Sequence, residues 1–172
     1  MGINGSDNRL REVQRTLPSY FSNLRVMSTL GIKPHGGCHF PPEGYAEFAR
    51  LIGPVVERDQ YDKKSATSIT APNLQRVYFA RGKKDEVIME FDQPVKWEDV
   101  LPDQFYLDGE KGKVTSGSAS GNTVSLKLSA PSSARKLTYL DSISWSPDKI
   151  LRGSNGIAAL TFCDVPILTH KP

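Results

Sequence analysis

The sequence has little of what disulfide, metal or nucleic-acid chemistry requires. Its 172 residues include two cysteines, Cys38 and Cys163, which are too few and too far apart for a disulfide framework or a cluster of metal ligands. The formal net charge is only +3, and the basic residues form no stripe that would attract a nucleic acid. No apolar run approaches the roughly 20 residues of a membrane span, and no glycine-rich phosphate loop follows a predicted strand. We therefore expect no metal, no cofactor, no nucleic-acid partner and no membrane insertion.

What the sequence does contain is enough apolar material for a folded core. Hydrophobic residues make up 38% and charged residues 24% of the chain, as is typical of a globular protein. The hydrophobic period changes once. Up to about residue 62 the apolar residues recur at helical spacing, and after about residue 72 they alternate with period two. The length suits one ordinary domain or two small ones, and the change of period favours two.

Residues 1–62 are predicted to form the end of a parallel α/β fold. A helix over residues 6–17 ends at Pro18, a strand covers residues 23–30, and an amphipathic helix follows over residues 42–58. This order is typical of a sheet whose faces are covered by helices. Because two helices and one strand cannot complete such a fold, we expect the segment to expose apolar surface meant for missing strands.

A loop with a histidine separates this predicted strand from the second helix. Gly36 and Gly37 free the backbone ahead of His39, and Pro41 and Pro42 suit the first turn of the following helix. His39 would thus be carried at a loop tip by a rigid scaffold, as catalytic histidines often are. The alternative is that the imidazole only caps the helix or hydrogen-bonds the loop.

The second half of the chain is predicted to form β-structure. Residues 63–72 are polar, rich in small side chains and closed by a proline, which predicts a linker. Residues 73–172 alternate most clearly over residues 87–92 and 123–128, and turn residues separate the runs. The other strand candidates are residues 74–80, 104–107, 113–116, 136–140 and 157–162. The pattern predicts an all-β antiparallel sandwich.

The run His-Phe-Pro-Pro-Glu-Gly-Tyr-Ala-Glu-Phe-Ala, which begins at His39, resembles the last block of SGNH (GDSL-type) hydrolases. In that block the catalytic histidine precedes a Pro-x-Gly-Tyr helix start. The longer stretch over residues 10–52 is similar to the end of the sialate O-acetylesterase-like branch, a group of carbohydrate acetylesterases. The resemblance implies a partial flavodoxin-like three-layer fold, an acetylated carbohydrate as substrate and His39 as the general base. It also implies a secreted or periplasmic protein.

The resemblance leaves the catalytic machinery incomplete. The family's Gly-Asp-Ser block, which carries the nucleophilic serine, and its two oxyanion blocks are absent from the sequence. The stretch most similar to the Gly-Asp-Ser block lies around Ser6, and its residue order is that of a helix N-terminus. The family's orienting Asp, three residues ahead of the histidine, is replaced by Gly36. We therefore expect a fragment that lacks the N-terminal part of the hydrolase domain and is inactive alone.

Two stretches of the second half, residues 88–95 and 123–128, resemble bacterial Ig-like modules. This similarity supports an alternative function, a non-catalytic Ig-like module for carbohydrate binding or assembly. Aromatic residues in such a module either stack on sugar rings or form the core. Trp97 follows the break at Pro94 and is the candidate for an exposed substrate-binding residue.

Overall fold

The computed structural model describes residues 7–34, 39–65, 68–142 and 145–169. Its helical elements are α1 (Asn8–Thr16), η1 (Leu17–Ser19), α2 (Pro42–Tyr61) and η2 (Pro102–Gln104). Its strands are β1 (Leu74–Phe79), β2 (Glu86–Phe91), β3 (Val95–Lys96), β4 (Phe105–Leu107), β5 (Val114–Ser120), β6 (Thr123–Leu128), β7 (Lys136–Tyr139), β8 (Arg152–Gly153) and β9 (Phe162–Leu168). In these ranges no helix has both the length and the hydropathy to span a membrane.

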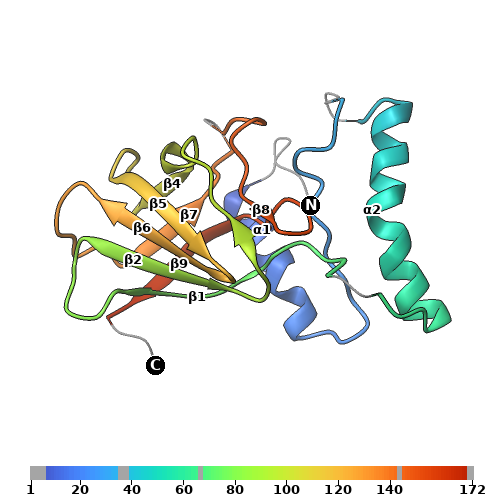
Figure 1. Ribbon diagram of the computed structural model, residues 1–172, viewed down its shortest axis with the longest axis horizontal. Helices are drawn as coiled ribbons and strands as arrows, with labels where there is room; N and C mark the ends of the chain where they lie inside the picture. The colour runs from blue at the N-terminus through green and yellow to red at the C-terminus, as the bar shows by residue number, and fades with distance from the viewer. Residues whose placement is uncertain (1–6, 35–38, 66–67, 143–144, 170–172) are drawn as a thin grey trace.

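Seven strands form one mixed sheet in the order β4-β7-β9-β1-β2-β6-β5. The neighbours β1 and β9 are parallel, and every other neighbouring pair is antiparallel. Strands β3 and β8 form a separate two-stranded ribbon. In Figure 1, α1 lies beside the sheet, whereas α2 stands apart at one end of the molecule. The parallel pair ties the last strand of the chain to the first.

The sheet encloses a hydrophobic core. Along β2, Val87, Met89 and Phe91 are buried, while Ile88 and Glu90 between them are partly exposed. This is the period-two pattern of a strand with one buried face. Buried residues of β4, at one edge of the sheet, belong to the same cluster as those of β5 at the other edge. The sheet therefore curls around its core.

Tyr139 lies at the centre of this core. Its ring centroid is 5.0 Å from that of Phe105 and 5.6 Å from that of Phe162. Its hydroxyl accepts a 2.6 Å hydrogen bond from the Leu151 N–H, so the polar end of the side chain is satisfied inside the protein. Burial raises the pKa of the Tyr139 hydroxyl, which keeps the group protonated. The tyrosine thereby joins β4, β7 and β9 to the chain entering β8.

This architecture shows that the predicted fold class is wrong. The β part is a mixed sheet that contains a parallel pair, not an antiparallel Ig-like sandwich. The described part of residues 1–62 forms no α/β three-layer tail, and the strand predicted over residues 23–30 joins no strand pair there. Period-two alternation indicates which residues face a core, but it does not say which strands pair. Residues 23–30 have the composition of a strand without a neighbouring strand to bond.

Helix α1 packs on the sheet with the opposite face to the one its sequence suggests. Its apolar residues Leu10 and Val13 are 51% and 55% exposed, whereas Arg11 and Arg15 are buried. The helix begins as a capped element, because Asp7 accepts a 2.7 Å hydrogen bond from the Arg9 N–H. The helical period therefore predicts the helix correctly, but the helix packs on the sheet with its basic face and not with its apolar one.

Arg11 is hydrogen-bonded all around its guanidinium. Nε donates to Thr161 Oγ1 at 3.1 Å, and Nη1 donates to Ser142 Oγ at 3.2 Å. Nη2 donates to Asn8 Oδ1 at 2.5 Å and to the Leu140 carbonyl at 3.4 Å. Burial lowers the pKa of Arg11 below its usual value, and the nearby Cys163, Asp7 and Asp141 only partly offset this effect. A buried charge with this many partners fixes the helix on the sheet, since any displacement would leave it unsolvated.

A second set of bonds joins α1 to β1 and β9. Arg15 Nη1 donates to the Leu74 carbonyl at 3.0 Å. Arg15 Nη2 is 2.6 Å from Glu12 Oε1, and the other oxygen of Glu12 accepts from the Cys163 N–H at 3.0 Å. These bonds connect residues that lie before and after the predicted linker at 63–72.

The outer face of β2 and β6 carries a charge cluster centred on Glu86. Its carboxylate lies 2.7 Å from Lys83 Nζ and 2.8 Å from Lys127 Nζ, and it accepts a 2.6 Å bond from Ser125 Oγ. Hydrogen bonds from Lys127, Lys83 and Ser125 lower the pKa of Glu86 from 4.5 to about 2. Because this folded-state pKa lies below the unfolded-state value, Glu86 stabilises the fold above about pH 4.5. That contribution is lost as the pH falls toward 2.

We expect Glu86→Gln to remove this pH dependence. Urea unfolding between pH 2 and pH 6 should show a shallower acid loss of unfolding free energy in the variant than in the unmodified chain, by about 1 kcal/mol. The matched control is Glu98→Gln, at an exposed position, which should leave the acid profile unchanged. Equal acid slopes in Glu86→Gln and the unmodified chain would contradict the role of this cluster.

Candidate functional site

The loop singled out in the sequence leads directly into α2. Pro41 has an extended backbone conformation and Pro42 is the first helical residue, a position where the missing N–H of proline has no cost. The Pro41 carbonyl accepts hydrogen bonds from the N–H groups of Gly44 at 2.9 Å and Tyr45 at 3.2 Å. The two prolines therefore set where the helix begins, and so where His39 is held.

His39 lies exposed just ahead of this first turn. Its Nδ1 is 3.4 Å from Tyr45 Oη. The Tyr45 ring in turn meets the Phe40 ring edge-on, with centroids 5.9 Å apart and ring planes at 90°. A histidine acts as a base through Nε2 when Nδ1 carries the proton and donates it to an acceptor. In the contact with Tyr45, the hydroxyl accepts from Nδ1–H in one tautomer of the imidazole and donates to Nδ1 in the other.

Gly44 is the point at which a side chain would disturb this arrangement. A Cβ there would lie 2.8 Å from Phe40 Cβ, which is closer than packed side chains come. We expect Gly44→Ala to displace Phe40 and lower the unfolding free energy by about 1–2 kcal/mol.

The matched control for this prediction is Gly53→Ala in the same helix. Nothing lies within 4 Å of a Cβ at Gly53, so the usual gain of alanine over glycine in a helix, about 0.5–1 kcal/mol, should appear. Thermal unfolding measures both variants. Equal stabilisation by the two alanines would contradict the packing of Phe40 on Gly44.

The described residues do not complete a catalytic triad around His39. Within residues 7–34, 39–65, 68–142 and 145–169, no serine or carboxylate side chain is hydrogen-bonded to the imidazole. Ser6, Gly36 and Cys38 lie outside the described residues. In the described part of the chain no three His, Cys, Asp or Glu side chains are grouped so that they could hold a metal ion. Among the described residues, the hydrogen-bond partner of the His39 imidazole is therefore Tyr45.

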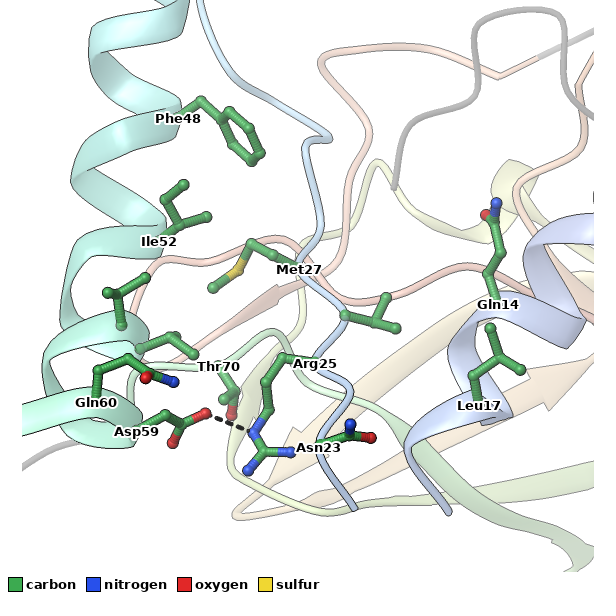
Figure 2. A pocket seen from close by; sticks show the side chains of 13 residues that line it. Gln14, Leu17, Asn23, Arg25, Met27, Phe48, Ile52, Asp59, Gln60 and Thr70 are labelled. Atoms are coloured by element: carbon green, nitrogen blue, oxygen red, sulfur yellow. Dashed lines mark ion pairs between the residues drawn. The ribbon is translucent and has the colours of Figure 1, made fainter. Parts of the chain in front are cut away.

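A groove of about 560 Å³ opens beside α2. Figure 2 shows Phe48 and Ile52 of α2 on one side of it and Met27, from the extended segment before the His39 loop, in its middle. The end of α1 forms the far side. Its charged members are paired with each other, since Arg25 Nε lies 2.8 Å from Asp59 Oδ2. Local sequence patterns do not predict the groove itself, because its lining comes from separate segments of the chain.

Trp97 is packed against the core. Its ring is stacked on Phe105 with centroids 5.9 Å apart, and a Cβ at Gly117 would lie 2.6 Å from the indole. The indole Nε1 is buried and has no hydrogen-bond partner among the described residues. A sugar-binding role for Trp97 stays a prediction, and this packing does not favour it.

Comparison with known proteins gives a structural likeness without a sequence match. No family model matches the chain, and no curated protein does. Among solved structures the chain is similar to a carbohydrate acetylesterase from Xanthomonas citri, with a TM-score of 0.58 and 13% identity over 77% of this chain and 30% of that chain. This chain shares its fold with part of a carbohydrate acetylesterase. It spans about 30% of that enzyme's length.

Two further likenesses are to the bacterial S-layer protein SbsC and to its N-terminal part. Their TM-scores are 0.43 and 0.41, each with 15% identity over 77% of this chain, and the matches cover 17% and 30% of those chains. Scores at this level do not establish a common fold.

Proposed function

We propose that the chain is the C-terminal part of a carbohydrate O-acetylesterase and that His39 is its general base. One observation carries the proposal. An exposed histidine is held at the start of α2 against Tyr45, in a chain that shares its fold with part of a carbohydrate acetylesterase. The resemblance of the run beginning at His39 to the last block of SGNH hydrolases supports the same conclusion, and it makes an acetylated carbohydrate the substrate.

The chemistry of this reaction divides between this chain and the rest of the enzyme. A serine Oγ attacks the acetyl carbonyl while His39 Nε2 takes its proton, and the imidazolium then protonates the departing sugar oxygen. Water, with His39 again as the base, hydrolyses the acetyl-serine and releases acetate. In this mechanism Tyr45 Oη accepts a hydrogen bond from the Nδ1–H of His39, which favours the tautomer that leaves Nε2 free. The serine and the oxyanion donors belong to the part of the enzyme that this chain does not contain.

The first test is the activity of the chain alone. Members of a triad act as a unit, so a base without its nucleophile should give almost no rate enhancement. We expect the chain and its His39→Ala variant to hydrolyse p-nitrophenyl acetate equally, at the rate of free imidazole. Hydrolysis that rises with chain concentration and disappears in His39→Ala would contradict this and place a nucleophile within the chain, with Ser6 the first candidate.

A further inference from the structure

A second cavity, of about 310 Å³, lies between α2 and the turn that follows β8. Its α2 members include Glu47, Arg50 and Pro54, which recur at helical spacing and therefore share one face of the helix. Phe48 and Ile52, which line the groove in Figure 2, belong to another face. The two hollows share no lining residue, so the smaller cavity is a separate feature of the fold.

Arg152, in β8, lines this cavity with a side chain that the fold holds in place. Its Nη1 donates a 3.1 Å hydrogen bond to the Gly156 carbonyl. Its Nη2 lies against the backbone of Gly31, where an added Cβ would collide with it. Gly31 also has a φ of 73°, a backbone conformation that favours glycine. The glycine at position 31 therefore gives the guanidinium its place in the cavity wall.

The turn that carries Gly156 is itself fixed by Asn155. The Asn155 Nδ2 group donates to the Thr70 carbonyl at 2.9 Å and to the Ser68 carbonyl at 3.1 Å. Its Oδ1 accepts a 3.0 Å bond from the Ile157 N–H. This wall of the cavity is therefore formed before any ligand binds, and a ligand would not have to order it.

The charge of Arg152 is not balanced by a carboxylate of the described chain. Two other shielded arginines, Arg15 and Arg58, each form an ion pair, whereas Arg152 is half-buried and its one hydrogen bond there is to the Gly156 carbonyl. The acid in the cavity wall, Glu47, lies 2.7 Å from Arg50 Nη2 and is paired with it. Donors of the Arg152 guanidinium thus remain for an anion, and their planar arrangement matches a carboxylate.

We propose that this cavity binds a small aliphatic monocarboxylate, whose carboxylate accepts hydrogen bonds from Arg152. The remainder of the wall sets the body of the ligand. Leu30, Ile32 and Ile157 line the cavity, and apolar side chains of this kind favour an aliphatic group. One uncompensated guanidinium matches one negative charge, whereas a phosphate group would need further donors. The inference does not depend on the proposed function, because His39 does not line this cavity.

Titration calorimetry of the full chain with cyclohexanecarboxylate tests this site. We expect saturable binding with a Kd on the order of 1 mM, as suits a ligand of this size. Cyclohexanecarboxamide, which has the same shape without the charge, should bind at least about tenfold more weakly. The variant Arg152→Gln should weaken carboxylate binding by a similar factor. The matched control is Arg135→Gln, at an exposed position outside the cavity, and it should bind as the unmodified chain does.

The comparison of acid and amide uses the unmodified chain, so it holds even if Arg152→Gln does not fold. Amide NMR signals of the labelled chain locate the ligand, and the largest shifts should fall at Gly31, Arg152 and Gly156. Absence of saturable binding, equal binding of acid and amide, or shifts elsewhere in the chain would overturn the inference. Inorganic phosphate binding as tightly as the carboxylate would also overturn it, since the site would then be a general anion site.

Discussion

Replacing Arg11 by alanine should lower the unfolding free energy by about 3–5 kcal/mol. The guanidinium is buried, and it donates hydrogen bonds to Thr161, Ser142 and the Leu140 carbonyl. Alanine would remove these donors together and leave buried acceptors without them, which costs about 1–3 kcal/mol for each unsatisfied group. It would also leave a cavity between α1 and the sheet. Urea unfolding followed by tyrosine and tryptophan fluorescence measures the loss.

The matched control for this variant is Arg9→Ala on the same helix. Arg9 is exposed, so its truncation should change stability by no more than about 0.5 kcal/mol. A third variant, Arg11→Lys, keeps the charge but cannot reproduce the planar set of donors, and it should be nearly as unstable as Arg11→Ala. Equal effects of Arg9→Ala and Arg11→Ala would show that the buried network does not hold α1 on the sheet.

Removing residues 1–62 altogether should destabilise the β part more than any single substitution. The predicted division into residues 1–62 and 73–172 stays a prediction, but bonds from Arg11, Arg15 and Glu12 cross it. We expect a chain of residues 63–172 to unfold cooperatively, because every buried member of the large core cluster except Leu30 lies within it. Its stability should fall below that of the whole chain by at least the Arg11→Ala loss.

This prediction is checked by thermal unfolding of the whole chain, of Arg11→Ala and of residues 63–172 under one set of conditions. The order of decreasing midpoint should be whole chain, Arg11→Ala, residues 63–172. A shortened chain as stable as the whole chain would mean that α1 contributes nothing to the β part, and that the two halves are independent. A shortened chain with no cooperative transition would mean that the predicted boundary falls inside one domain.

Local patterns in the sequence predict much of the secondary structure of this fold. The alternation of Val87, Met89 and Phe91 locates β2, and the helix predicted over residues 42–58 is confirmed as α2, which runs from Pro42 to Tyr61. The strand alternation and the helical period both depend on residues that are close together in the sequence. The parallel pairing of β1 with β9, which opposes Val77 and Ile167, depends on contacts between distant parts of the chain and leaves no local trace.

The reversed face of α1 shows a second limit of reading periodicity. Leu10 and Val13 have the spacing of a buried stripe, and yet they are exposed, while Arg11 is buried. The cause is tertiary, because the chain just after β7 and just before β9 presents the Ser142 and Thr161 hydroxyls and the Leu140 carbonyl to the guanidinium. Nothing within residues 8–16 indicates those acceptors.

In the candidate site, too, some features follow from the local sequence and others only from the folded chain. The position of His39 ahead of a helix follows from the prolines after it, and the sequence suffices to predict it. The contact between His39 and Tyr45 follows from the helix that begins at Pro42. The groove beside α2 could not be foreseen, because Leu17, Met27 and Ile52 come together only in the folded chain.

The most direct test of the central claim is to restore the missing nucleophile. The whole chain is mixed with an N-terminal piece of a sialate O-acetylesterase-like enzyme that carries its Gly-Asp-Ser block and ends ahead of its own histidine block. Hydrolysis of p-nitrophenyl acetate is then followed for the chain and for its His39→Ala variant. The account predicts activity that requires the serine of the added piece and falls on the order of 1,000-fold in His39→Ala. Activity that is unchanged in His39→Ala, or no activity although the two pieces co-sediment, would contradict the assignment of His39 as the base.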